Sequence, residues 1–211
     1  MENQKCIFCD RKNFSERLIY ENDFAYVIAS LGQITDGGYL LIIPKMHVPC
    51  MGALTGQTQK EVFSLFFQCL ALSTDRKDRV NSWPATVFEH GIVGQTIQHA
   101  HLHLLPSALD LTTQIKKDFP TSEIQKIDSL NELSDIHAEQ RMPYLFWITP
   151  DGKMMVCWNP PAPAQYLRTV AANLLNRPER ADWRTMDQEL DTRLWKKTVS
   201  RMRLYFFQAL A

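Results

Sequence analysis

The sequence predicts an α+β fold in which an antiparallel sheet carries a long helix and is followed by a mainly helical C-terminal extension. Two short apolar runs, Phe24–Ala29 and Tyr39–Ile43, lie on either side of the turn signal Asp36-Gly37-Gly38 and predict a pair of antiparallel strands. From Thr58 onward the apolar residues recur at helical spacing, which predicts a long helix that ends near Asp75–Asp78.

Two further strands are expected before the middle of the chain. Thr86–Phe88 is predicted to be a strand and Glu89–Thr96 a loop. His99–Leu105 is predicted to be the second strand, which Pro106 ends because proline cannot continue the backbone ladder.

A hairpin is expected in the second half of the chain. Residues 107–137 are polar and are predicted to be helical in part. Tyr144–Ile148 and Lys153–Val156 then flank Pro150-Asp151-Gly152, which predicts two strands joined by a tight turn.

Two more helices are predicted over Ala162–Leu175 and Met186–Leu210. Because the character of the chain changes after residue 106, we expect two parts. Residues 1–106 form the core domain, and residues 107–211 form a C-terminal extension that packs on it.

Composition narrows the classes of partner. The 211 residues, 45% of them hydrophobic, suffice for a folded core. The 23 basic and 23 acidic residues leave a net charge of zero, so we expect no nucleic-acid partner, no membrane contact, and a local pocket for any phosphate. The sequence has no apolar run of roughly 20 residues and no secretion pattern, which predicts a cytoplasmic location. Five cysteines there indicate thiols or metal ligands rather than disulfides.

The most informative segment places three histidines at alternate positions, His99, His101 and His103. On a strand, alternate side chains share one face, whereas on a helix the three rings would have no common focus. Two kinds of chemistry fit such a face: a catalytic metal with a third ligand elsewhere, and nucleophilic attack on phosphorus by a neutral imidazole. The spacing alone does not separate them, and strand histidines without a role are a third reading.

Residues around this segment resemble the histidine triad (HIT) superfamily. His99-Ala-His101-Leu-His103-Leu-Leu matches the family's motif of three alternating histidines at every position. Gly94-Gln95-Thr96 is similar to the family's Gly-Gln-Ser/Thr, and residues 37–47, which end in Pro44-Lys45-Met46-His47, are similar to its earlier conserved stretch. The two blocks stand in the right order, and the resemblance covers about residues 1–106.

The resemblance implies a role for each histidine. His101 would attack the α-phosphorus of a nucleotide conjugate and carry the nucleotidyl group covalently. His103 and Thr96, with Gln95 beside it, would bind the phosphate oxygens. A free imidazole has a pKa near 6.5 and is neutral and nucleophilic at neutral pH. Family members act on phosphoramidates, dinucleoside polyphosphates and nucleotide sugars, usually as homodimers, so the resemblance implies a nucleotide ligand and a homodimer.

A second metal-like pattern lies at the N-terminus, where Cys6-Ile-Phe-Cys9 forms a Cys-x-x-Cys knuckle. Zinc binding, a redox pair and a chance pair all fit this spacing. The resemblance favours structural zinc, because some HIT proteins bind it through such a knuckle and the histidines that correspond to His47 and His99. Two cysteines and two histidines make a closed structural site. The remaining cysteines are expected to be ordinary thiols.

The sequence departs from the family pattern at three places. Leu31, with Ser30 beside it, stands where many members have the acid or amide that binds ribose, so Ser30 becomes the candidate. Glu89 and His90 stand where an amide is usual: Glu89 would accept a proton and His90 would serve as a leaving-group acid, or both would pair with loop backbone. Tyr39 replaces a common histidine.

The C-terminal extension is similar to that of a bacterial subset of HIT-like proteins in Gln165-Tyr-Leu-Arg168 and Asp182-Trp183-Arg184. Arg168 is expected to bind a substrate phosphate as a bidentate donor, the alternative being a solvated helix face. Together these features predict a nucleotidyl hydrolase or transferase with structural zinc. A hydrolase that uses the three histidines as catalytic metal ligands and a non-catalytic nucleotide-binding protein remain the alternatives.

Overall fold

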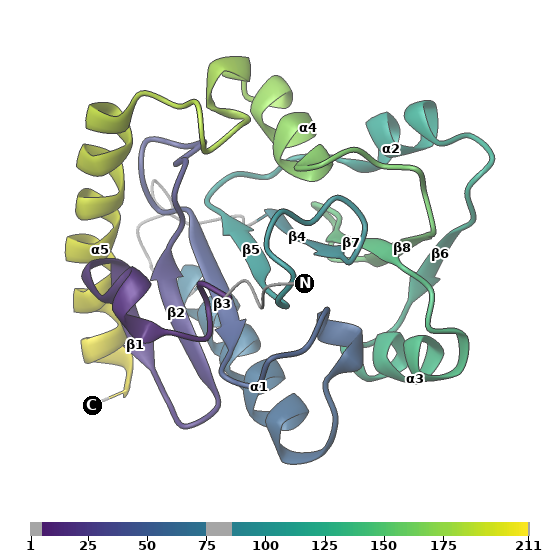
Figure 1. The fold of residues 1–211 in the computed structure, drawn as a ribbon, viewed down its shortest axis with the longest axis horizontal. Helices are drawn as coiled ribbons and strands as arrows, with labels where there is room; N and C mark the ends of the chain where they lie inside the picture. The colour runs from purple at the N-terminus through teal and green to yellow at the C-terminus, as the bar shows by residue number, and fades with distance from the viewer. Residues whose placement is uncertain (1–5, 75–85, 211) are drawn as a thin grey trace.

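The computed structural model describes residues 6–74 and 86–210 (Figure 1). Its centre is an eight-stranded sheet in the order β1-β2-β3-β5-β4-β7-β8-β6. Every neighbouring pair is antiparallel, and helices cover the sheet, which confirms the predicted α+β class. None of the helices in the described ranges is long and apolar enough to cross a membrane.

The strands are, in chain order, β1 (Leu18–Glu21), β2 (Ala25–Ala29), β3 (Leu40–Pro44), β4 (Thr86–Gly91), β5 (Leu102–Leu105), β6 (Ile124–Ile127), β7 (Tyr144–Ile148) and β8 (Met154–Trp158). The α-helices are α1 (Gly56–Thr74), α2 (Thr112–Asp118), α3 (Leu130–Gln140), α4 (Tyr166–Leu174) and α5 (Gln188–Leu210). Short 3₁₀ helices are η1 (Arg11–Arg17), η2 (Met51–Ala53) and η3 (Pro178–Arg180).

Each face of the sheet has its own apolar core. On one face, buried side chains of α1, α3 and α5 pack against the strands. On the other face the cover consists of the N-terminal knuckle, η1, α2 and α4. Figure 1 shows α5 lying along β1 and β2, so the end of the chain returns to the strands that begin it.

The segment after residue 106 is built into the same sheet. β4 pairs with β7 over five residues, from Val87 opposite Ile148 to Gly91 opposite Tyr144. This pairing extends β4 to Gly91, so the prediction of a loop from Glu89 onward was wrong for its first three residues. The partner strand lies more than 50 residues further along the chain, and no local pattern reveals it.

Most other predicted elements are present, with shifted ends. The predicted end of the long helix near Asp75–Asp78 lies outside the described residues. The strand predicted from His99 begins only at Leu102, which lies opposite Ile42; before it, the Ala100 amide donates at 2.8 Å to the carbonyl of Val48, beyond the end of β3, so the regular pairing with β3 stops there. β1 and β6 were not predicted; both are short edge strands.

Candidate functional site

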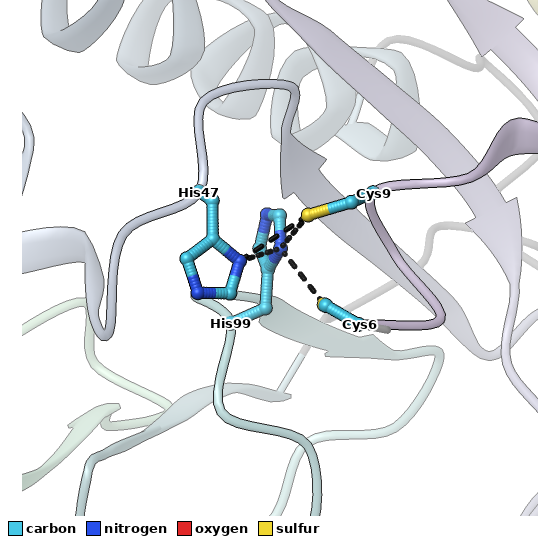
Figure 2. Close-up of side chains that lie close together, drawn as sticks. All are labelled: Cys6, Cys9, His47 and His99. Carbon is cyan, nitrogen blue, oxygen red and sulfur yellow. Dashed lines mark hydrogen bonds between the residues drawn. The ribbon is translucent and has the colours of Figure 1, made fainter. Parts of the chain in front are cut away.

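Two cysteines and two histidines from three distant parts of the chain meet beside the sheet (Figure 2). The possible ligand atoms of Cys6, Cys9, His47 and His99 all lie within 4.8 Å of one another. The cysteines precede η1, His47 follows β3 and His99 precedes β5, so the cluster joins the N-terminus to two segments of the sheet. Figure 2 shows the cysteines approaching the imidazoles from one side.

The distances in this cluster fit a tetrahedral cation site. His47 Nδ1 lies 3.2 Å from both Cys9 Sγ and His99 Nδ1. Cys6 Sγ and Cys9 Sγ lie 3.3 and 3.6 Å from His99 Nδ1. Tetrahedral zinc with ordinary bond lengths places its nitrogen and sulfur ligands about 3.3–3.8 Å apart. The backbone of Pro44 accepts a hydrogen bond from His99 Nε2 at 2.8 Å, which leaves Nδ1 free for a metal.

The three alternating histidines share one face, as their spacing predicted. All three are buried on the face covered by the N-terminal knuckle and α4, where Phe8 contacts the rings of His99 and His101. Ala100 and Leu102 point into the opposite core. His99 thus belongs to the metal-type cluster, whereas His101 and His103 line a cavity.

His101 is held as a neutral imidazole with a defined free nitrogen. Its Nδ1 lies 2.7 Å from the carbonyl oxygen of His99, and because a carbonyl only accepts, Nδ1 carries the proton. Nε2 therefore keeps its lone pair. Burial, with the positive charge of Arg168 nearby, lowers the pKa of His101 to about 4.

His103 has the opposite tautomer. Arg168 Nη1 donates to the Tyr39 hydroxyl at 3.0 Å, and the Tyr39 hydroxyl lies 2.6 Å from His103 Nδ1. The Tyr39 hydroxyl, which accepts from the guanidinium, has His103 Nδ1 as the nearest acceptor for its own proton, so we assign the ring proton of His103 to Nε2. That Nε2 is buried and has no hydrogen-bond partner in the described part of the chain, so it is a donor available to a ligand.

The cavity collects nearly all the residues predicted to bind substrate. Side chains from the loop after β2, the loop between β4 and β5, and the C-terminal extension line it. These are His90, His101, His103, Gln95, Thr96, Ser30 and Arg168 among the predicted residues, and Ile7, Phe8, Arg17, Leu31, Leu41, Gly94, Ile97, Gln165 and Trp183 besides them. Neither aspartate nor glutamate is among these lining residues.

The extension approaches the cavity loops closely at two glycines. Gly94 has φ +73°, and a Cβ there would lie 2.8 Å from the carbonyl oxygen of Pro163. A Cβ on Gly32, where φ is +65°, would lie 2.5 Å from both Arg168 Nη2 and Trp183 Cβ. Both positions therefore require glycine, and the extension forms one wall of the cavity.

Glu89, predicted to act at the site, lies on the other side of the sheet. It accepts hydrogen bonds from the Met51 amide at 2.7 Å and the Tyr144 hydroxyl at 2.6 Å and is fully buried. In β4, Phe88 and His90 face the histidines, so the residue between them faces away. Burial raises the pKa of Glu89 to about 7, although both hydrogen bonds oppose this.

His90 lines the cavity, but its hydrogen bonding does not suit an acid. Its Nε2 accepts the Leu167 amide at 3.0 Å, which requires a lone pair on that nitrogen. Burial lowers the pKa of His90 to about 3, and the neighbouring His101 and Arg168 add to this. The Nε2 of His90 therefore has no proton to give to a leaving group.

Replacing Glu89 with glutamine is expected to remove a pH dependence of stability. The pKa of this carboxyl is about 7 in the folded chain against an ordinary 4.5. The unfolded chain therefore ionises first, and the contribution of this carboxyl to the free energy of unfolding falls by up to about 3 kcal/mol as the pH rises from about 4.5 to 7, whereas the low pKa values of His90 and His101 act in the opposite direction. Between about pH 5 and pH 8, urea unfolding should therefore show Glu89→Gln gaining more stability, or losing less, than the parent chain. The same pH-dependent change in Glu89→Gln and the parent chain, or an equal effect of the exposed control Glu139→Gln, would contradict this prediction.

Sequence reasoning missed Arg17 and gave Trp183 no role. Arg17 ends η1 and carries no motif, so only its burial beside the cavity marks it. Trp183 was noticed only as part of a stretch similar to other proteins. Tyr39 was noticed as a departure from the family, but its hydrogen bonds to His103 and Arg168 connect parts of the chain that lie 64 and 129 positions away.

Comparisons with known proteins identify the family of the chain. The model of the HIT domain family matches residues 11–109. An uncharacterized HIT-like protein of Mycoplasma genitalium is 30% identical over 103 residues, which cover 48% of this chain and 72% of that protein. The chain belongs to the HIT family.

Two further similarities are more limited. The nitrilase and fragile histidine triad fusion protein NitFhit of Caenorhabditis elegans is 28% identical over 92 residues, 44% of this chain, but the match spans only 20% of the fusion protein. A solved HIT family protein from Bacillus anthracis is 22% identical, with a TM-score of 0.42 over 64% of this chain and 94% of that one.

Proposed function

We propose that the chain is a nucleotidyl hydrolase or transferase that acts at the α-phosphorus of a nucleotide conjugate through a covalent nucleotidyl group on His101. One observation carries the proposal. The hydrogen bond from His101 Nδ1 to the carbonyl of His99 leaves the Nε2 lone pair on a neutral ring that lines the cavity. A neutral imidazole in this position is the nucleophile that phosphoryl chemistry requires.

The reaction then divides into two displacements. In the first, the His101 Nε2 lone pair forms a bond to the α-phosphorus, and the leaving group departs with the electrons of the bond that breaks. In the second, water or another acceptor attacks the same phosphorus, the phosphorus–nitrogen bond breaks, and its electrons return to His101. The acceptor's proton passes to solvent, and the ring is restored.

The other cavity groups stabilise the charge that develops on the phosphate oxygens. His103 Nε2–H is a buried donor without a protein partner, and Arg168 brings a guanidinium that lacks a carboxylate partner among the described residues. Thr96, Gln95 and Ser30 line the same cavity and are proposed to contact the phosphates and the ribose.

We assign the cluster of Cys6, Cys9, His47 and His99 to structural zinc. Two thiolates and two imidazoles at tetrahedral distances fill the coordination sphere, so such a site leaves no position for substrate. Bound zinc would fix the segment before β5 and so position His101, two residues further on. A reducing compartment such as the cytoplasm would keep both cysteines as thiols.

The rival, a hydrolase with a catalytic metal on the three histidines, fits the geometry less well. Within the described ranges, His101 and His103 belong to no group of three or more metal-ligating side chains. The Nδ1 atoms of both rings are already engaged, by the carbonyl of His99 and the hydroxyl of Tyr39. The other alternative is a non-catalytic nucleotide-binding protein, which would bind nucleotides without turning them over.

A substrate panel followed by mass spectrometry tests the proposal. The panel contains adenosine and guanosine phosphoramidates, dinucleoside tetraphosphates and nucleotide sugars. A reaction quenched within one turnover should show the mass of one nucleotidyl group on the peptide that contains His101. Binding without turnover of any panel member would favour the non-catalytic alternative, and turnover that persists fully in His101→Ala would exclude the covalent mechanism.

Removing the Tyr39 hydroxyl is expected to lower kcat with little change in KM. Tyr39→Phe loses the group that holds the His103 proton on Nε2, a hydrogen bond of about 1–3 kcal/mol, equivalent to roughly 10- to 100-fold in rate. Tyr166→Phe is a matched control, because that hydroxyl contacts Asp118 away from the cavity. Steady-state kinetics decide: an unchanged kcat in Tyr39→Phe, or an equal loss in the control, would show that Tyr39 does not position His103.

A further inference from the structure

The cavity has more positive charge than one phosphate requires. Two arginines line it, Arg17 and Arg168, with exposed fractions of only 8% and 4%. The lining residues include no carboxylate, although the whole chain has as many acidic as basic side chains. Buried guanidinium groups are costly unless an anion pairs with them, and neither arginine forms an ion pair among the described residues, so this charge points to an anionic ligand.

The two arginines donate to carbonyls on either side of Ser30 and Leu31. Arg168 donates to the Tyr39 hydroxyl and to the carbonyl of Gly32, which places it next to His103. Arg17 donates through Nη1 to the carbonyl of Ala29 at 2.9 Å, at the end of β2 and directly before Ser30. Arg168 therefore lies beside the group that faces the reacting phosphate, whereas the hydrogen bond of Arg17 is made at the start of the segment that carries Ser30 and Leu31.

Most N–H groups of the Arg17 guanidinium have no hydrogen-bond partner in the described part of the protein. Its bond to Ala29 is the one hydrogen bond it makes there, and it forms no salt bridge within 4.0 Å among the described residues. The acid that influences it, Asp191, is occupied by the amides of Gly32 and Gln33 at 3.0 and 2.9 Å. A guanidinium offers five donors, so most of those of Arg17 are free for a ligand.

The Ser30–Leu31 end of the cavity also lacks an acceptor suited to a ribose diol. Leu31 has no polar atom in its side chain, and the Ser30 hydroxyl donates to the carbonyl of Leu31 at 2.8 Å. Two neighbouring hydroxyls are best matched by a carboxylate, whereas the guanidinium of Arg17 matches an oxyanion with several acceptor atoms.

We propose that Arg17 forms a second anion subsite at the Ser30–Leu31 end of the cavity, and that the substrate is a nucleotide conjugate whose ribose bears an additional phosphate. The assignment rests on the proposed function for the orientation of the nucleotide, with its α-phosphate at His101. The histidines alone do not specify this substrate class.

Calorimetric binding to the zinc-loaded chain tests this proposal without requiring turnover. The probes are adenosine 5′-monophosphate, adenosine 3′,5′-bisphosphate and adenosine 2′,5′-bisphosphate. At least one bisphosphate is expected to bind tenfold or more tightly than the monophosphate, and the better of the two identifies the hydroxyl that carries the phosphate. Equal affinities for all three probes in the parent chain overturn the proposal, and this comparison needs no variant.

Variants of Arg17 test whether this residue causes the preference for a bisphosphate over the monophosphate. Arg17→Gln is expected to bring the bisphosphate and monophosphate affinities within about twofold of each other, and Arg17→Lys to keep part of the difference. Arg11→Gln is the matched control, because Arg11 is exposed, pairs with Glu21 and does not line the cavity. A preference that survives in a folded Arg17→Gln overturns the assignment. The covalent adduct on His101 is judged separately, so failure of the mechanism and failure of the subsite are distinguishable.

Discussion

Replacing His101 with alanine is expected to lower kcat for any nucleotidyl substrate of this chain by roughly 10³- to 10⁵-fold. The variant loses the Nε2 lone pair, and none of the other cavity groups can take its place. His103 presents a protonated nitrogen to the cavity, and the Nε2 of His90 already accepts the amide of Leu167. Steady-state kinetics on the best substrate of the panel measures the loss.

A matched control separates this effect from a general disturbance. His137 is a buried histidine outside the cavity, with its Nε2 3.4 Å from Cys50 Sγ. His137→Gln should keep most of the activity, and His101→Ala should keep its metal content and its far-ultraviolet circular dichroism spectrum. If His101→Ala retained more than about a tenth of the parent kcat, another group would be the nucleophile.

Removing the two thiols of the N-terminal knuckle is expected to have the largest effect on stability. Cys6→Ser combined with Cys9→Ser would remove two ligands of the proposed zinc and with them the link between the N-terminus and the segment before β5. We expect the free energy of unfolding to fall by about 3 kcal/mol, which lowers Tm by about 6–12 °C for a chain of this size. Metal analysis and thermal unfolding measure both effects.

The control for this variant is Cys69→Ala, which removes a buried thiol of α1 far from the cluster in sequence. It should lose some stability through a small cavity but bind one zinc per chain. If the chain were instead a hydrolase with a catalytic metal on the three histidines, the opposite result is expected. The metal would then remain bound after replacement of Cys6 and Cys9 and would be lost after replacement of His101.

The features that the sequence predicted well are those in which a local pattern has a single physical meaning. Alternation of His99, His101 and His103 with small apolar residues fixed their common face, even though only the last of the three lies in the paired part of β5. The pairing of β2 with β3 followed from two apolar runs around a glycine turn. The metal-type cluster was implied by the resemblance to HIT proteins that bind zinc through a Cys-x-x-Cys knuckle and two histidines, not by a local pattern.

The features that the sequence did not predict depend on contacts between distant segments. Glu89 was assigned to the site because it stands where HIT proteins have an amide before the histidines, but in β4, which pairs with β7, this carboxyl lies on the opposite face. Arg17 is an ordinary cation in a polar stretch until β1 and β2 bring it beside Ser30. The hydrogen bond between Arg168 and Tyr39 joins the extension to the catalytic face, and no spacing rule predicts it.

The stereochemical course at phosphorus tests the central claim of a covalent nucleotidyl-histidine most directly, because it does not require the intermediate to accumulate. The substrate is a nucleotide conjugate made chiral at the α-phosphorus with sulfur and hydrolysed in isotopically labelled water. Two successive in-line displacements, the first by His101 Nε2, each invert the phosphorus, so the account predicts net retention of configuration. Net inversion would show that water attacks the substrate directly and would contradict the account.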